Sequence, residues 1–159
     1  MRAIILTLVF ALFFSCNEKE KQSSLKKIPK NAIVVDINGN PIELPKDKLI
    51  ILNFMAYSCS ACMKEIPVIK KVLRKPEFKD KFYLVGLVID TNKNDLSDKE
   101  FPKYANNKIN FIKFPVPGTP TTYIITPKGK KLVYIFGAVT EENFEKFLKE
   151  ALRKYKGAI

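Results

Sequence analysis

Two continuous apolar runs dominate the hydrophobic pattern of this chain. Residues 49–55 (LIILNFM) and 82–90 (FYLVGLVID) each pass through at least seven positions without a charge. Such runs are typical of strands that are buried on both faces of a sheet. Between them, apolar residues recur with helical spacing until Pro76, which should end the helix near Lys75. The pattern therefore predicts a strand, a helix and a second strand parallel to the first.

Two further segments have the pattern of β-hairpins. Residues 32–44 predict an N-terminal hairpin, because their apolar ends flank an Asn-Gly turn. Residues 121–136 predict a second hairpin, because the turn sequence Pro-Lys-Gly-Lys at 127–130 separates two apolar runs. We expect the first hairpin to be an extension of the fold and the second to belong to the main sheet.

The remaining stretches complete an alternating order of strands and helices. Ser97 and Glu100 can cap a helix whose length is limited by Pro102, and residues 109–116 are predicted to be extended. Thr140 can cap a final helix that carries acidic residues in its first turn and one apolar face. This order predicts an α/β fold with a mixed central sheet flanked by helices.

The N-terminus has the pattern of an export signal. An apolar segment of twelve residues ends two positions before Cys16, which is too short to cross a bilayer but typical of a signal peptide. The residues up to Cys16 resemble a lipobox, so we expect a signal peptide at 1–15, a lipidated tether at 16–31 and a folded domain at 32–159. A protein processed in this way is a membrane-anchored lipoprotein of the periplasm or cell surface. An ordinary cleaved signal or an uncleaved anchor are the alternatives.

Composition limits the chemistry that the chain can perform. Its 159 residues include no histidine and three cysteines, which excludes histidine-dependent nucleophiles, histidine-ligated metals and a four-cysteine zinc site. The formal charge is +12, and +11 remains without residues 1–15. The lysines are scattered, with few aromatic residues between them. In an exported domain this favours a basic surface that tolerates anionic lipid head groups over a nucleic-acid site.

The first predicted strand leads directly into Cys59-Ser60-Ala61-Cys62, at the start of the predicted helix. Unpaired backbone N–H groups and the helix dipole favour the thiolate of Cys59, lowering its pKa from about 8.5 toward about 7. Cys62, one turn later, can attack a mixed disulfide on Cys59. The pair can therefore cycle between dithiol and disulfide without a cofactor or metal. A structural disulfide, or half of a shared metal site, is the alternative.

The residues around this motif resemble the run L-N-F-W-A-x-W-C-x-x-C-x-x-E-x-P of exported TlpA/ResA-like thiol-disulfide oxidoreductases. The matching residues are Leu52, Asn53, Phe54, Ala56, Cys59, Cys62, Glu65 and Pro67. Met55 and Ser58 depart from the run where tryptophan is usual, and the chain contains no tryptophan. A second signature of the family, G-x-P-T-T, is similar to residues 118–122. The resemblance covers about residues 33–155 and implies a thioredoxin-like fold.

The resemblance also implies roles for individual residues. Cys59 and Cys62 would be the redox pair, with Ser58, Thr119 and a cis Pro120 beside them as substrate-binding residues. Glu65 would lie near the cysteines, where its negative charge opposes thiolate formation. Asn53 occupies the position of a buried acid in cytoplasmic thioredoxins, which favours Glu65 as the substitute proton acceptor. The alternative for Glu65 is a solvated carboxylate on the helix surface.

The sequence thus predicts a membrane-tethered oxidoreductase that reduces disulfides in client proteins. By resemblance, its clients include the haem-binding cysteines of apocytochrome c, and its electrons come from a membrane thiol donor. The neutral residues Ser60 and Ala61 disfavour a strongly oxidising pair. A dithiol oxidase, a lipoprotein binding module with a structural disulfide, and a cuprous-ion chaperone are the alternatives.

Overall fold

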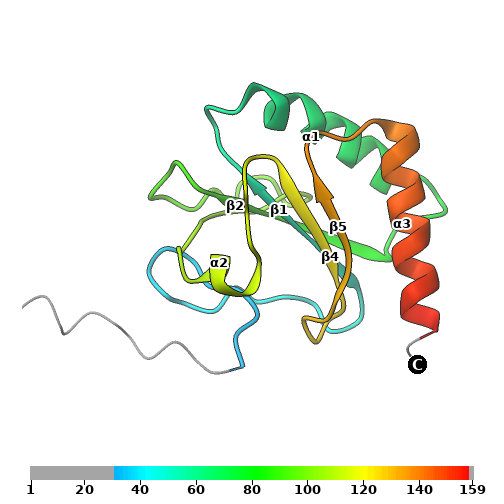
Figure 1. Cartoon of the computed structure of the whole chain (residues 1–159), viewed down its shortest axis with the longest axis horizontal. Coiled ribbons are helices and arrows are strands. Elements are labelled where there is room, and N and C mark those ends of the chain that lie inside the picture. The colour runs from blue at the N-terminus through cyan, green and yellow to red at the C-terminus, as the bar shows by residue number, and fades with distance from the viewer. Residues whose placement is uncertain (1–30, 158–159) are drawn as a thin grey trace, which may run out of the picture.

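The computed structural model describes residues 31–157, so the expected signal peptide and Cys16 lie outside the described residues. Five strands form one sheet in the order β3-β2-β1-β4-β5, with helices on both faces (Figure 1). The elements in chain order are β1 (Leu49–Met55), α1 (Ser60–Leu73), β2 (Phe82–Val88), β3 (Lys103–Ala105), α2 (Asn110–Lys113), β4 (Thr121–Ile125), β5 (Lys131–Phe136) and α3 (Glu141–Lys156). This confirms the α/β class and the mixed sheet.

The strand β1 lies at the centre of the sheet. It pairs in parallel with β2 from Leu49 opposite Phe82 to Met55 opposite Val88, and antiparallel with β4 on its other side. All seven residues of β1 are buried. The predicted strand–helix–parallel strand unit is confirmed, and so is the second hairpin, formed by β4 and β5.

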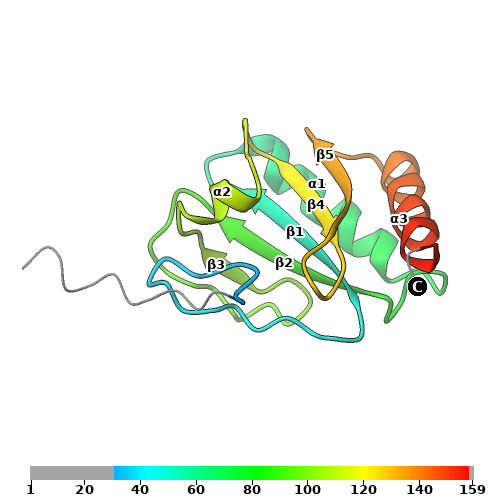
Figure 2. The same ribbon diagram turned by 60° about the horizontal axis from the view of Figure 1, so that its bottom comes forward.

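Hydrophobic side chains form a core on each face of the sheet. On one face, Ile51 of β1 packs in a cluster with residues of α1 and with Phe144 of α3. On the other face, Phe54 lies in a cluster with Val34 and Phe114, under the N-terminal segment and the chain around α2. Figure 2 shows α1 and α3 together on one side of the sheet and α2 on the other. Alternate residues of β1 therefore supply both cores, as expected for a strand covered on both faces.

The N-terminal hairpin predicted at residues 32–44 does not form as two strands. A single antiparallel bridge joins Val35 to Pro41, and Gly39 closes a turn with a positive φ of 79°. Only two backbone hydrogen bonds join the two arms, from the N–H of Asp36 to Asn40 and from the N–H of Ile42 to Val34, while the outward-facing N–H and C=O of Val35 bond to the side chain of Asn110. The carboxylate of Asp36 accepts N–H groups from the turn itself. The segment is thus a turn that packs onto the sheet.

Two predictions for the crossover region were wrong. The helix capped by Ser97 is absent, because that hydroxyl donates to Asp95 and the chain instead forms the short strand β3 beside β2. Residues 109–116 are not extended, because they contain α2, whose first turn is supported by the Asn107 side chain accepting from the backbone N–H of Ile109. Both segments contain side chains that bond to the nearby backbone, and such residues favour turns over regular elements.

The C-terminal helix begins as predicted. Thr140 caps α3, its hydroxyl accepting from the N–H of Asn143 while the Asn143 side chain accepts from the N–H of Thr140. Helix α1 ends at Leu73, two residues before the expected end. Within residues 31–157, none of the helices combines the length and apolar character that a bilayer crossing requires.

Candidate active site

The redox motif lies where β1 leads into α1. Cys59 is the N-cap residue of α1, and it is joined to Cys62 by a disulfide with the two Cα atoms 5.3 Å apart. The backbone N–H of Cys62 points at the Cys59 sulfur, 3.1 Å away. Cys62 is fully buried, whereas Cys59 is partly exposed. The helix start therefore directs its positive end at the accessible sulfur, which favours its thiolate once the pair is reduced.

Asp90 holds the loop that precedes the motif. Its carboxylate accepts the backbone N–H groups of Tyr57 and Ser58, at 2.8 and 2.9 Å. The bond from Ser58 is the main reason that the pKa of Asp90 lies below its ordinary value of 3.8. The sequence reasoning missed Asp90. Its position was a usable signal, because it follows β2, whose carboxyl end lies beside that of β1.

Thr119 and Pro120 lie directly beside the cysteines. The peptide bond between them is cis, as expected, and the Thr119 carbonyl oxygen lies 3.6 Å from the Cys59 sulfur. Pro120 is buried, and its own carbonyl accepts the N–H of Gly137 at 3.0 Å. Ser58, the other predicted substrate-binding residue, is exposed next to Cys59. The structure thus brings Ser58, Cys59, Thr119 and Pro120 together.

Glu65 is buried, at 2% exposure, and is not a solvated helix carboxylate. One carboxylate oxygen accepts from the Asn53 side chain at 2.9 Å, and the other accepts from the backbone N–H of Val139 at 3.2 Å. The same Asn53 amide nitrogen donates to the hydroxyl of Thr122 at 2.9 Å. Burial outweighs these hydrogen bonds and raises the pKa of Glu65 above its ordinary value of 4.5. The sequence did not reveal Thr122 or Val139 as partners.

A hollow of about 690 Å³ lies beside Glu65. It lies between α1 and the start of α3, and its lining includes Ser60 from the redox motif, Lys64, Glu65 and Thr140. The buried side-chain oxygen of Asn53 has no hydrogen-bond partner among residues 31–157. Glu65 therefore combines burial and a raised pKa with a position in the lining of a hollow beside the redox motif.

No cluster of three or more side chains suited to holding a metal ion occurs in residues 31–157. The cysteines of the motif are joined to each other, and the carboxylate nearest in sequence, Glu65, bonds to an amide and a backbone N–H. The chemistry that this arrangement supports directly is thiol–disulfide exchange at Cys59.

Comparison with known proteins gives matches along most of the chain. The profile of the thioredoxin-like domain family matches residues 42–152. The thiol-disulfide oxidoreductase ResA of Bacillus anthracis is 32% identical, with 84% of this chain and 81% of that protein aligned. The protein of the same name from Bacillus cereus strain ATCC 10987 is 29% identical over 94% of both chains.

Solved structures match the fold at lower sequence identity. An exposed lipoprotein thioredoxin of Streptococcus pneumoniae superposes with a TM-score of 0.57 at 20% identity, covering 74% of this chain and 96% of that one. StoA from Bacillus subtilis superposes with a TM-score of 0.53 at 21% identity, covering 72% of this chain and 93% of that one. At these identities the superpositions support the fold alone.

Proposed function

This chain belongs to the thioredoxin-like family, among its ResA/TlpA-type thiol-disulfide oxidoreductases, and from that membership we propose a membrane-tethered, extracytoplasmic enzyme that reduces disulfides of client proteins. The observation that carries the proposal is the unequal exposure of the two sulfurs. Cys59 is partly exposed at the helix start, and Cys62 is fully buried behind it. A client can reach only the first sulfur, which is the arrangement that a two-step exchange requires.

In the proposed cycle, the thiolate of Cys59 attacks one sulfur of the client disulfide. A mixed disulfide forms, and the released client sulfur takes up a proton. Cys62 then loses its proton and attacks the Cys59 sulfur, which releases the second client thiol and leaves the Cys59–Cys62 disulfide. Two electrons pass to the client, and a membrane thiol donor returns two electrons to the pair.

Thr119 and Pro120 would hold the client during this exchange. The Thr119 carbonyl lies 3.6 Å from the Cys59 sulfur, so a client backbone N–H bonded to that carbonyl would bring its own sulfur to Cys59. Ser58 is exposed next to Cys59 and would contact the same client segment. Pro120, which has no N–H and is buried, would keep competing polar ligands away from the sulfurs.

Glu65 would exchange a proton with Cys62. Glu65 lies one helical turn beyond Cys62, and burial raises its pKa above the ordinary value, which makes its carboxylate a better proton acceptor. As a carboxylate it would accept the Cys62 proton before the second attack. The hollow beside it would let that proton reach water.

The cellular part of the proposal rests on resemblance and on the N-terminal sequence. Lipidation of Cys16 would anchor the chain to a membrane of the periplasm or cell surface, with residues 17–31 as the tether. The haem-binding cysteines of apocytochrome c are the proposed client, because the relatives that share the motif are associated with cytochrome c maturation. The exposed lipoprotein thioredoxin of Streptococcus pneumoniae is a precedent for such an anchor on this fold.

The reduction potential of the Cys59–Cys62 pair tests the proposed direction. The full chain is equilibrated in glutathione and dithiothreitol buffers, and the fraction of disulfide is measured by thiol alkylation. We expect a value between about −250 and −300 mV, in the range of a reductant. A value near about −120 mV would identify a dithiol oxidase, and resistance to reduction below about −300 mV would identify a structural disulfide.

Two cysteine variants separate the roles of the sulfurs. The Cys62→Ser chain should accumulate a mixed disulfide between Cys59 and a disulfide-containing client peptide, because the resolving thiol is missing. The Cys59→Ser chain should form no such adduct, because Cys62 is buried. Disulfide reduction that persists in Cys59→Ser would overturn the assignment.

A further inference from the structure

One end of the sheet lies opposite the redox motif. Strands β1 and β2 are parallel and start side by side, with Leu49 opposite Phe82. The β4–β5 turn reaches the same end, because Ile125 pairs with Ile50 of β1. Cys59 follows the other end of β1, after Met55. In Figure 1 the β4–β5 turn and the end of α3 lie at the bottom of the view, and α1 lies at the top.

Basic residues gather at this end, which we call the basal end. They come from the loops before β1 and β2, from the β4–β5 turn and from the last turn of α3. The basal cluster comprises Lys46, Lys79, Lys81, Lys128, Lys130, Arg153 and Lys156, and all seven are exposed. Helix α3 joins this end because Lys149 pairs with Glu77 in the loop before β2, at 3.6 Å, and Lys154 donates to the Leu132 carbonyl at 2.9 Å.

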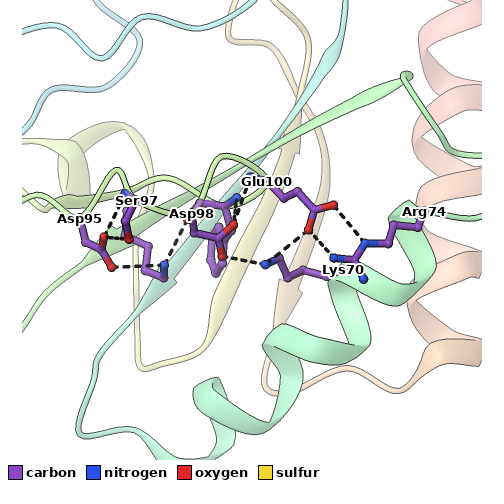
Figure 3. Close-up of polar contacts among 8 residues, drawn as sticks. Lys70, Arg74, Asp95, Ser97, Asp98 and Glu100 are labelled. Carbon is purple, nitrogen blue, oxygen red and sulfur yellow. Dashed lines mark hydrogen bonds and ion pairs between the residues drawn. The ribbon is translucent and has the colours of Figure 1, made fainter.

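The members of the basal cluster lack ion-pair partners within residues 31–157. Many basic residues on the sides of the helices, by contrast, are paired: Lys70 with Asp98 at 2.7 Å and Arg74 with Glu100 at 2.5 Å (Figure 3). Lys71 likewise pairs with Glu141 across to α3, at 2.5 Å. Those pairs join neighbouring elements, whereas the basal charges have no such partner, because Asp80 and Glu77 in the loop before β2 pair with Lys48 and Lys149 instead. A cluster of this kind adds nothing to the fold and is suited to an external anionic surface.

We propose that the basal cluster rests on an anionic lipid surface. Two features favour a membrane as the occupant over a compact ligand. The seven charges are spread across the width of the sheet and two helix–loop junctions, so they match an extended surface of negative charge. The chain also enters the fold at this end, because Ile33 packs against Gly129 of the β4–β5 turn, where a Cβ atom would lie 3.4 Å from its side chain. The described part of the chain therefore begins beside the cluster.

This contact would orient the enzyme. The seven residues of β1 separate the basal end from the redox motif by about 23 Å, at about 3.3 Å per residue. That separation exceeds a Debye length at physiological salt, so the lipid charge would hold the basal end without acting on the Cys59 thiolate. The sulfurs would face away from the bilayer, toward clients. This inference is independent of the direction of electron transfer.

Lysine acetylation of the full chain on vesicles tests the proposal. The chain is mixed with vesicles of phosphatidylcholine alone or with about 30% phosphatidylglycerol, collected with them, and treated with an acetylating reagent before mass spectrometry. On anionic vesicles we expect Lys79, Lys81, Lys128 and Lys130 to react several-fold more slowly than on neutral ones. About 0.5 M salt should remove the difference. Equal reactivity on the two vesicle types, or absence of the chain from anionic vesicles, would overturn the proposal.

Two quadruple variants provide a matched comparison. The basal variant replaces Lys79, Lys81, Lys128 and Lys130 by glutamine, and the control replaces four exposed lysines from the opposite half of the fold. The control positions are Lys64, Lys93 and Lys108, which have no ion pair within residues 31–157, and Lys146, whose only ion pair is with the exposed Glu142 on the same helix. At about fivefold in partition for each charge near the surface, the basal variant should lose a hundredfold or more of its salt-sensitive binding. Equal losses in the two variants would indicate general charge attraction and overturn the assignment to the basal end.

Discussion

Replacing Glu65 by glutamine isolates the contribution of the buried carboxyl group. The shape of the side chain is kept, so the packing between α1 and the sheet is unchanged. The wild-type carboxyl group offers an oxygen to Asn53 at 2.9 Å and a second oxygen to the N–H of Val139 at 3.2 Å. Glutamine offers a single oxygen, and its NH₂ group would face one of these two donors. One buried hydrogen bond is therefore lost.

The loss of folding stability in this variant can be estimated from the burial of Glu65. An unpaired buried donor costs about 1–3 kcal/mol, and Glu65 is only 2% exposed. Below pH 4.5 both side chains are neutral, so the variant should be about 1–3 kcal/mol less stable than the wild type in this range. The disulfide-bonded form is used for the comparison, because its covalent state does not change with pH.

The difference should shrink as the pH rises. Burial raises the pKa of Glu65 in the folded state above 4.5, so the folded protein keeps a proton that the unfolded chain has released. The stability that this proton contributes is fully present below pH 4.5 and is lost as the pH rises through the folded pKa. Glutamine does not titrate. The stability of the wild type should therefore fall toward that of the variant over this window.

Urea unfolding at a series of pH values, followed by circular dichroism, measures the free energy of unfolding of the wild type and of Glu65→Gln as a function of pH. Glu142→Gln is the control, because Glu142 is exposed and its hydrogen bond to Lys146 lowers its pKa. Its contribution has the opposite sign, being present above pH 4.5 and lost on acidification. Parallel curves for the wild type and Glu65→Gln from pH 4 to pH 8, about the range in which such groups titrate, would refute the reasoning.

Two further predictions concern the supports of the site. In the Asp90→Asn variant the single amide oxygen can accept only one of the Tyr57 and Ser58 N–H groups. Both backbone amides should therefore exchange hydrogen faster, and the reduction potential of the Cys59–Cys62 pair should shift. Unchanged hydrogen exchange would show that the carboxylate does not hold the loop. Gly86→Ala places a Cβ 3.0 Å from the Phe101 ring and should lower the free energy of unfolding by about 1–3 kcal/mol in denaturant titrations. The control Gly157→Ala, with ordinary helical φ and a nearest contact of 3.6 Å, should change it little, and equal effects would contradict the steric argument.

The central part of the fold could be predicted because its signals are local. The runs at residues 49–55 and 82–90 are buried on both faces, and only the middle of a covered sheet accommodates such strands. The turn at 127–130 and the cap at Thr140 are equally local, and both were placed correctly. The cysteine pair and the helix start followed from one short motif, and the cis Pro120 followed from the resemblance of residues 118–122 to a second signature of the family.

The features that were missed depend on residues far apart in the chain. The N-terminal segment is held on the fold by Asn110, 75 positions from Val35, whose side chain bonds to both backbone groups of that residue. The position of Asp90 after β2 was a usable signal, but its partners, 32 and 33 positions away, could not be named from it. In each case a side chain bonds to backbone groups far away in the chain, and only the packed structure determines which side chain arrives.

The alternation of side chains along β1 explains why Asn53 contacts Glu65. In β1 the side chains of Leu49, Ile51 and Met55 face α1 and α3, whereas the residues between them face the other core. Asn53 is the polar member of the first set, and it therefore points toward α1, where it meets Glu65. Because side chains alternate with a period of two, a slip of one residue in pairing would turn Asn53 away from Glu65 and expose the carboxyl group to a wholly apolar face. The pairing of Asn53 with Thr122 thus fixes the environment of Glu65, and through it the pKa on which the proposed proton transfer depends.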